Sequence, residues 1–178
     1  MKLKTLAVVL LGTLLLGACS QSDGLLGKLG LNKSSKKVVA ERLKLDVKIP
    51  MLDSEQLWKS ENYQGKPILI VIMAPWCPWC KRALPALDQT SQAYAGKVEV
   101  VGAFDGVDVP EIEKIKEEYQ IKTKILYDAG IAIRHLHLEY SFPYSVLFDK
   151  DHRWVRSWNG YSDNLAEMYA EEIDKLLK

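Results

Sequence analysis

The chain has 178 residues, of which 24 are Lys or Arg and 23 are Asp or Glu, so its formal net charge is +1. This balance gives no electrostatic basis for binding nucleic acid, which requires clustered positive charge. The length suits a single domain with one core after the removal of a short leader.

The first eighteen residues have the pattern of an export signal. A short basic start is followed by an apolar stretch over 6–16, too short to span a membrane but of the length of a signal-peptide core. It ends in LGAC (16–19), which resembles a bacterial lipobox, whose cysteine becomes the lipid-modified first residue of the mature protein. We therefore expect a signal peptide over 1–18, a lipid on Cys19 and an extracytoplasmic location. Ser20, which is not aspartate, favours the outer membrane in a Gram-negative cell. The alternative is an ordinary signal peptide that is cleaved nearby.

Residues 19–41 are rich in Ser, Gly, Lys and Asn and are expected to form a flexible tether. A short leucine-containing turn on the membrane surface is the alternative. The folded domain is expected over 42–178. Its first feature, alternating apolar and polar residues over 43–49, predicts a half-exposed strand that Pro50 ends, followed by a short helix over 54–60.

The rest of the chain alternates strands and helices. The run 67–73 has no polar side chain and predicts a strand that is buried on both faces. Further strands are expected at 98–104, 124–127, 145–148 and 153–158, the last two as a hairpin. Helices are expected at 81–94, 110–119, 130–137 and from about 163 onward, and Pro85 should kink the first of these. This order predicts an α/β fold with a mixed central sheet flanked by helices.

The most informative motif is Cys77-Pro78-Trp79-Cys80, between the buried strand and the next helix. Two cysteines three positions apart at such a junction can close a disulfide and reopen it. Cys77 lies at the helix N-terminus, where unpaired N–H groups and the helix dipole favour an anion, so we expect it to be the exposed nucleophile. Cys80, one turn further on, is expected to be the buried partner that attacks the mixed disulfide.

A CxxC pair is also half of a common zinc site. Such a site usually takes four ligands, whereas the chain has three cysteines, and one of them is Cys19. The nearest other candidates, His135 and His137, follow Cys80 by more than fifty positions and are expected at an exposed helix end. The strand–CxxC–helix order favours redox chemistry. We therefore expect no metal and no cofactor beyond the Cys77–Cys80 disulfide.

Three anchors in this order resemble the thioredoxin superfamily, and within it the TlpA/ResA-like extracytoplasmic thioredoxins. They are Gly65-Lys66-Pro67, the heptapeptide APWCPWC (74–80), and Pro143 before an apolar strand that ends in Phe148-Asp149. The resemblance covers about residues 43–178 and implies a thioredoxin-like fold with a strand–helix insertion at 105–130. It also implies a thiol:disulfide oxidoreductase that reduces protein disulfides and receives electrons from a membrane donor of the DsbD/CcdA type.

The same resemblance assigns residues around the cysteines. Pro143 matches the family's cis-proline, so we expect a cis bond after Phe142 and a loop whose backbone can pair with an extended substrate peptide. Tyr144 follows it, where the family often has threonine.

Two tryptophans flank the thiols. Trp76 matches the family's tryptophan before the first cysteine, which shields the site. Trp79 lies with Pro78 between the cysteines, where the dipeptide helps to set the reduction potential.

The chain departs from the family at the residues that would deprotonate the second cysteine. Val71 replaces the buried aspartate of thioredoxin, and Ala83 stands where the branch often has glutamate. TlpA/ResA-like reductases tend to place an acid in the insertion, so Asp105 and Asp108 are candidate proton acceptors for Cys80. The alternative is that both are solvated turn residues.

Two other functions remain open. One is a disulfide-introducing oxidase or isomerase of the same fold, because the direction of the reaction depends on the reduction potential alone. The other is a copper-binding chaperone like the Sco proteins, which share the fold but separate their cysteines by three residues and use a distant histidine. The spacing here is one residue shorter, and no histidine lies near Pro143 in the sequence, which disfavours copper.

Overall fold

The computed structural model describes residues 44–130 and 141–178, which belong to one compact unit, Val39–Lys178. The predicted signal peptide, the lipid on Cys19, the tether and nearly all of the predicted helix at 130–137, with its two histidines, lie outside the described residues. In the two described ranges we find no helix with the length and apolar character that crossing a membrane requires.

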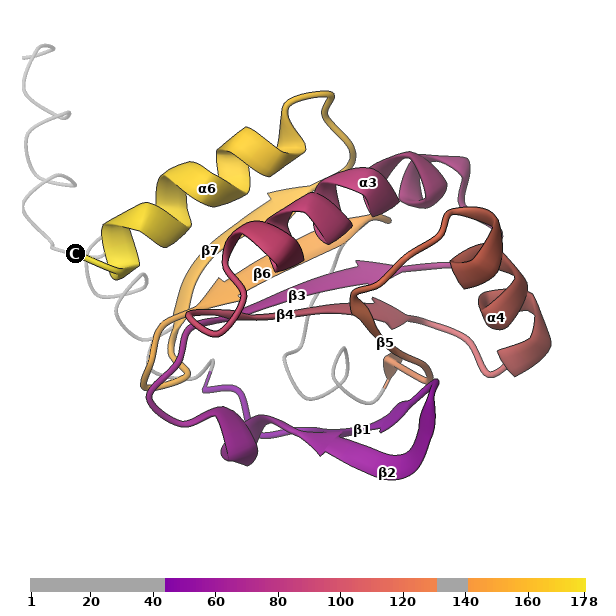
Figure 1. Cartoon of the computed structure of the whole chain (residues 1–178), viewed down its shortest axis with the longest axis horizontal. Coiled ribbons are helices and arrows are strands. Elements are labelled where there is room, and N and C mark those ends of the chain that lie inside the picture. Colours follow the sequence, from indigo (N-terminus) through magenta and orange to yellow (C-terminus); the bar gives the residue numbers. More distant parts are fainter. Residues whose placement is uncertain (1–43, 131–140) are drawn as a thin grey trace, which may run out of the picture. The chain divides into compact units, whose positions relative to one another are not determined.

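A seven-stranded mixed sheet forms the centre of the domain (Figure 1). Its spatial order is β2-β1-β5-β4-β3-β6-β7. β3 pairs in parallel with β4 and antiparallel with β6. The strands are β1 (Lys48–Met51), β2 (Ser54–Lys59), β3 (Ile68–Met73), β4 (Glu99–Phe104), β5 (Lys124–Leu126), β6 (Tyr144–Phe148) and β7 (Trp154–Asn159). The predicted α/β fold with a mixed sheet and a closing β6–β7 hairpin is confirmed.

Three described helices and one short 3₁₀ helix accompany the sheet: α3 (Pro78–Ala93), α4 (Val109–Glu118), α6 (Leu165–Leu176) and η1 (Ser60–Tyr63). Figure 1 shows α3 and α6 lying next to each other on one face of the sheet. α4 and β5 occupy the expected strand–helix insertion. α3 starts three residues earlier than predicted because Pro78 takes its first position, where the missing N–H costs no hydrogen bond. Pro85 lies inside α3, and its expected kink stays a prediction.

β3 is buried on both faces, as its apolar run predicts. Its alternate side chains enter two separate cores, one of which also receives side chains from all three described helices. Leu69, Val71 and Met73 belong to this helix-side core. Ile68, Ile70 and Ile72 belong to the other core, with Trp58 and Phe148. Each fully buried large side chain contributes roughly 1.5–3 kcal/mol to the stability of the fold. β3 is therefore firmly held, and it fixes the position of the following segment, which carries the cysteines.

The chain before β3 forms a hairpin, so two sequence predictions were wrong. The strand predicted over 43–49 begins only at Lys48, and it continues through Pro50, where the sequence pattern predicts its end. The strand pairing shifts register between Pro50 and Met51, and such an irregularity is where a sheet tolerates proline. Residues 54–59 form β2 instead of a helix, because Trp58 pairs with Ile49 and is buried in the core opposite the helices.

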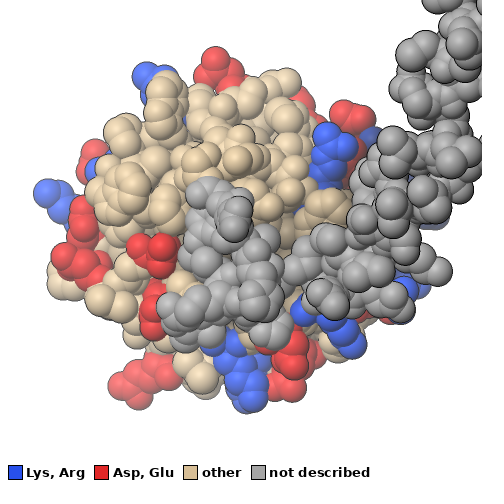
Figure 2. Space-filling model, turned by 180° about the vertical axis from the view of Figure 1, so that it is seen from behind, with Lys and Arg blue, Asp and Glu red and all other residues tan. Residues whose placement is uncertain are grey.

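Charged side chains of both signs are mixed on the protein surface. On the face opposite to that of Figure 1, the described Lys and Arg residues alternate with Asp and Glu around a largely uncharged area (Figure 2). No extended area of one sign is seen among the described residues of that face, which agrees with the nearly neutral composition.

Asp88 connects α3 to the segment before β5. Its Oδ1 accepts hydrogen bonds from the Lys122 N–H (2.9 Å), the Thr123 N–H (2.8 Å) and the Thr123 hydroxyl (2.8 Å). Burial alone would raise the pKa of this carboxyl, but the hydrogen bonds from Thr123 and Lys122 hold its pKa below its ordinary value. A depressed pKa stabilises the fold above the unfolded-state pKa, and this stabilisation is lost as the pH falls through the folded-state pKa.

We therefore expect Asp88→Asn to lower the free energy of unfolding by about 1 kcal/mol at pH 7. The difference from the wild type should begin to shrink below about pH 4, the ordinary pKa of aspartate, and should disappear only below the depressed folded-state pKa, where the wild-type carboxyl is also uncharged. Urea denaturation at about pH 7 and about pH 2 measures both values, with Glu118→Gln as the control at an exposed carboxylate. An equal loss at both pH values would mean that the charge of Asp88 contributes nothing.

Candidate active site

Cys77 and Cys80 lie where β3 passes into α3. The chain leaves β3 at Met73 and enters α3 at Pro78, with Cys77 as the N-cap residue. Both sulfurs are free thiols in this structure. The buried strand on one side and the helix on the other therefore fix the distance and orientation of the pair.

Cys77 is buried, so the prediction of an exposed nucleophile was wrong. Its residue is 4% exposed, compared with 1% for Cys80. The Cys77 Sγ donates a long hydrogen bond to the carbonyl oxygen of Phe142 at 3.7 Å. Phe142 lies 65 positions away in the sequence, and nothing in the local motif indicates this contact.

Cys80 is held as a neutral thiol. Burial raises its pKa well above its ordinary range, the backbone N–H of Ala74 opposes this rise, and the neighbouring Cys77 adds to it. The Ala74 N–H donates to the Cys80 Sγ at 3.5 Å. Cys80 can therefore act as a nucleophile only after another group has removed its proton.

The Phe142–Pro143 peptide bond is cis, as the sequence predicted. The loop that contains it is fastened to the end of β7: the Gly160 N–H donates to the Pro143 carbonyl at 2.9 Å. Asn159 Oδ1 also accepts from the N–H and the hydroxyl of Ser141, at 3.1 and 2.8 Å. Tyr144, the next residue after the proline, is half-buried and begins β6.

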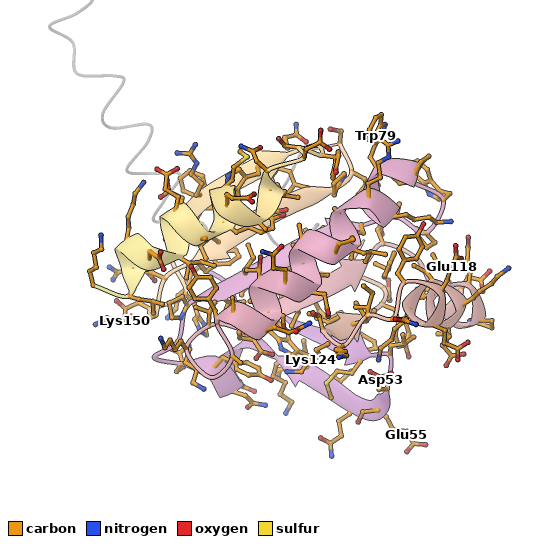
Figure 3. The ribbon with its side chains drawn as sticks, turned by 45° about the horizontal axis from the view of Figure 1, so that its top comes forward. Asp53, Glu55, Trp79, Glu118, Lys124 and Lys150 are labelled. Atoms are coloured by element: carbon orange, nitrogen blue, oxygen red, sulfur yellow. The ribbon has the colours of Figure 1, made fainter. Side chains whose placement is uncertain are left out.

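Trp76 and Trp79 are the most exposed aromatic side chains among the described residues, at 73% and 52%. Trp76 contacts the ring of Phe142 edge-on, with ring centres 5.8 Å apart. Trp79 stacks on Tyr161 at 5.9 Å, and the guanidinium of Arg82 lies 4.9 Å from the Trp79 ring centre. Figure 3 shows Trp79 projecting outward at the end of α3. Tyr161 and Arg82 are not predicted from the sequence, because neither belongs to a motif and their contacts with Trp79 appear only in the fold.

The structure separates the two candidate acids. Asp105 directly follows β4, and its N–H donates to the Met73 carbonyl at 2.7 Å, so it is half-buried at the same sheet edge as the cysteine turn. Asp108 is exposed and caps α4, where its Oδ1 accepts the Glu111 N–H at 3.2 Å. Val71 is buried in the helix-side core, as is Ala83.

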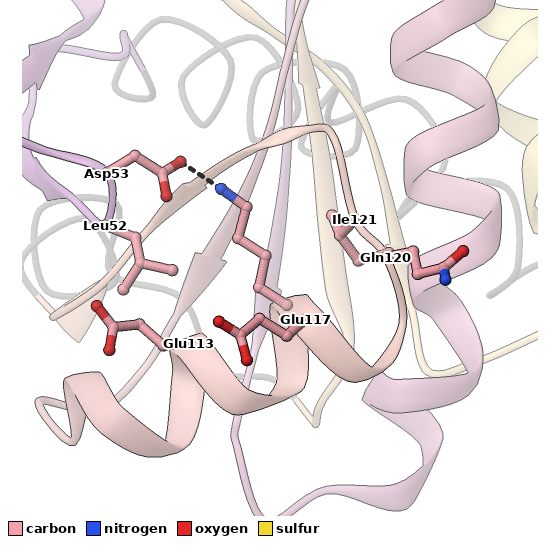
Figure 4. Close-up of a pocket in the computed structure, with 7 residues that line it drawn as sticks. Leu52, Asp53, Glu113, Glu117, Gln120 and Ile121 are labelled. Atoms are coloured by element: carbon pink, nitrogen blue, oxygen red, sulfur yellow. Dashed lines mark hydrogen bonds and ion pairs between the residues drawn. The ribbon is translucent and has the colours of Figure 1, made fainter.

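No cluster of three or more His, Cys, Asp or Glu side chains suited to a metal occurs in residues 44–130 and 141–178. Carboxylates do gather in a hollow of about 400 Å³ between the β1–β2 turn and α4 (Figure 4). There Asp53 forms an ion pair with Lys116, and Glu113 and Glu117 lie beside them. None of the described lining residues belongs to the cysteine turn or the cis-proline loop.

The model of the AhpC/TSA family matches residues 40–173. Over 70 residues the chain is 36% identical to protein disulfide-isomerase A5 of Mus musculus, covering 39% of this chain and 13% of that protein. Over 120 residues it is 23% identical to the thiol-disulfide oxidoreductase ResA of Bacillus thuringiensis subsp. konkukian, covering 66% of this chain and 65% of ResA. The chain thus spans less than two thirds of the length of either relative.

Solved structures show the same fold. A secreted disulfide oxidoreductase of Mycobacterium tuberculosis, described as homologous to E. coli DsbE, has a TM-score of 0.60 and 25% identity, over 74% of this chain and 98% of that one. The exposed lipoprotein thioredoxin of Streptococcus pneumoniae has a TM-score of 0.64 and 16% identity, over 74% of this chain and all of that one (100%). These likenesses confirm the thioredoxin-like fold. The protein therefore belongs to the AhpC/TSA family, within the thioredoxin superfamily that its sequence motifs predicted.

Proposed function

We propose that this protein is a thiol:disulfide oxidoreductase that works outside the cytoplasm and reduces protein disulfides through Cys77 and Cys80. One observation carries the proposal: two thiols lie at the N-terminus of α3, and the Sγ of the first, Cys77, is 3.7 Å from the Phe142 carbonyl of the cis-proline loop. The likeness to ResA and to disulfide isomerases supports the same chemistry.

In the first step, the Cys77 thiolate attacks one sulfur of the substrate disulfide. A bond forms between this sulfur and Cys77, the substrate disulfide breaks, and the second substrate sulfur leaves as a thiolate and takes up a proton. An extended substrate segment would pair with the cis-proline loop as an added strand, and the Phe142 carbonyl would accept its N–H once the Cys77 thiol no longer donates to this carbonyl. Trp76, Phe142 and Tyr144 would shape the surface on which this segment lies.

In the second step, Cys80 loses its proton and attacks the Cys77 Sγ. The Cys77–Cys80 disulfide forms, the mixed disulfide breaks, and the remaining substrate sulfur leaves as a thiol. Two electrons have then passed to the substrate, and a dithiol donor must reduce the enzyme again. We propose a membrane donor of the DsbD/CcdA type, with no metal, nucleotide or flavin bound to this chain.

A lipid on Cys19 would hold the domain at a membrane surface, and Ser20 favours the outer membrane in a Gram-negative cell. The mass of the mature N-terminal residue tests this directly. A mature chain without a lipid at Cys19 would contradict the anchor.

The function is tested with the purified dithiol protein and a protein disulfide. We expect two substrate thiols to appear for each Cys77–Cys80 disulfide that forms, and none with Cys77→Ser. A dithiol protein that reduces no disulfide would contradict the proposal.

The likeness to protein disulfide-isomerase A5 favours an isomerase or oxidase as the second candidate, which the reduction potential distinguishes. Copper titration of the dithiol protein tests the chaperone alternative.

We propose Asp105 as the proton acceptor for Cys80, because it lies at the cysteine edge of the sheet and Asp108 is occupied as a helix cap. Asp105→Asn is expected to slow the second step roughly 100-fold. In this variant the rate should rise about tenfold per pH unit near neutrality, because the raised pKa of Cys80 leaves only a small thiolate fraction. Stopped-flow measurement of thiol release gives both values.

Asp108→Asn is the matched comparison, since asparagine also caps a helix. A slower second step in this variant alone would assign the proton transfer to Asp108. Unchanged rates in both variants would exclude both acids.

A further inference from the structure

An open hollow of about 480 Å³ begins directly beside the cysteine turn. Four of its lining residues, Pro78, Lys81, Arg82 and Pro85, have the i, i+3, i+4 and i+7 spacing that places them on one face of α3. The hollow is bordered on its other sides by Tyr119 at the end of α4 and by Tyr161 and Asp163 before α6.

The hollow adjoins the reactive sulfur through the backbone. Pro78 is the residue after Cys77, and Tyr161 follows Gly160, whose N–H donates to the Pro143 carbonyl at 2.9 Å. Consider a substrate polypeptide that is joined to Cys77 by a disulfide and lies against the cis-proline loop. The residues next to its cysteine can therefore reach the hollow.

The lining of the hollow carries an excess of positive charge. Neither Lys81 nor Arg82 forms an ion pair with a carboxylate in the described part of the chain. Arg82 lies over the ring of Trp79, which leaves its charge uncompensated. The one carboxylate that lines the hollow, Asp163, already accepts a hydrogen bond from the Tyr161 hydroxyl at 2.8 Å.

The remaining lining is apolar or aromatic. Pro78 and Pro85 are exposed, and Tyr119 is 37% exposed. Such side chains provide contact area for the aliphatic parts of a bound chain, while Lys81 and Arg82 provide donors for its carboxylates.

We propose that this hollow binds an acidic segment of the substrate protein, adjacent to the cysteine that forms the mixed disulfide with Cys77. The inference rests on the proposed function and adds a substrate preference to it. Carboxylates of the segment form ion pairs with Lys81 and Arg82, and its aliphatic groups pack on the two prolines and Tyr119.

The test uses two disulfide-linked model peptides that differ only in having Glu or Lys beside the cysteine. The wild-type dithiol protein is expected to reduce the Glu peptide about fivefold faster at low ionic strength, a modest preference because exposed ion pairs are weak. High salt should remove most of this preference. The double variant Lys81→Glu, Arg82→Glu should prefer the Lys peptide instead.

Lys150→Glu is the matched control, because it reverses an exposed lysine in the β6–β7 turn, far from Trp79 in Figure 3. It should keep the wild-type preference. The ratio of the two peptide rates within each variant cancels any effect of the charge change on the reactivity of Cys77 itself.

The outcomes separate this proposal from the proposed function. Equal rates for the two wild-type reactions, or a preference that survives in the double variant, would overturn the acidic-segment proposal and leave the redox function standing. A wild-type protein that reduces neither peptide, nor the small neutral hydroxyethyl disulfide, would overturn both.

Discussion

Cys80→Ala is expected to accumulate a mixed disulfide with the substrate protein and to lose turnover by roughly 1000-fold. Cys77 keeps its place at the N-terminus of α3 and still attacks, but the variant has no thiol that can release the product. The loss is large because an oriented intramolecular group has a far higher effective concentration than any thiol in solution. Non-reducing electrophoresis shows the adduct, and mass spectrometry of the captured protein identifies the substrate.

The burial of Cys80 requires a second variant. Removing the sulfur leaves the Ala74 N–H without its acceptor, which costs stability in a site that is 1% exposed. Cys80→Ser keeps an acceptor atom near that N–H and should trap the same adduct. Cys77→Ser is the matched control and should trap nothing. Adducts captured by Cys77→Ser instead would mean that the two cysteines have exchanged roles.

Local patterns predicted the parts of the fold that depend on local physics. The short unbroken apolar run of β3 favours a strand buried on both faces, and the structure has it at Ile68–Met73. The cysteine pair at the start of α3 followed from the CxxC motif, and the cis bond before Pro143 followed from the resemblance to the thioredoxin superfamily.

The errors concern contacts that no sequence motif predicts. β2 has few apolar residues. Its extended form depends on Trp58, which pairs with Ile49 and is buried in the same core. The burial of Cys77 depends on Phe142, and the stack on Trp79 depends on Tyr161. No local window contains both partners of the last two contacts.

The role of Asp108 as a helix cap is predictable from the sequence. An aspartate three residues before Glu111, at the start of a helix, is the signature of an N-cap. Giving weight to that signature would have reduced the two candidate proton acceptors to Asp105. The capping role and the proposed catalytic role compete for the same carboxylate, and the structure gives Asp108 to the helix.

The Cys77–Cys80 couple is expected to have a reduction potential near thioredoxin's value of about −270 mV, far below the value of about −120 mV for the oxidant DsbA. A couple becomes oxidising when its reduced form is strongly stabilised. The helix N-terminus favours a thiolate at Cys77, but the Phe142 carbonyl at 3.7 Å accepts from the thiol and repels the thiolate. These opposing contacts leave the reduced form without the stabilisation that an oxidant needs.

The difference between the two values is about 150 mV, or about 7 kcal/mol for a two-electron couple. Equilibration with dithiothreitol or glutathione buffers measures the potential, and the exposed Trp76 and Trp79 beside the cysteines provide a fluorescence signal for the redox state. The same titration of Phe142→Ala, which keeps the backbone carbonyl and removes the ring against Trp76, is expected to change the potential little. A large shift in that variant would assign the effect to the ring.

A wild-type potential above roughly −150 mV would contradict the reductase direction, because such a couple donates its disulfide to substrates instead of reducing theirs. It would mean that the dipole of α3 outweighs the Phe142 carbonyl at the Cys77 sulfur. The order of attack by Cys77 and Cys80 would still hold, since it follows from the place of Cys77 at the N-terminus of α3 and the raised pKa of Cys80, and not from the potential. The protein would then act as the oxidase or isomerase that its likeness to protein disulfide-isomerase A5 supports.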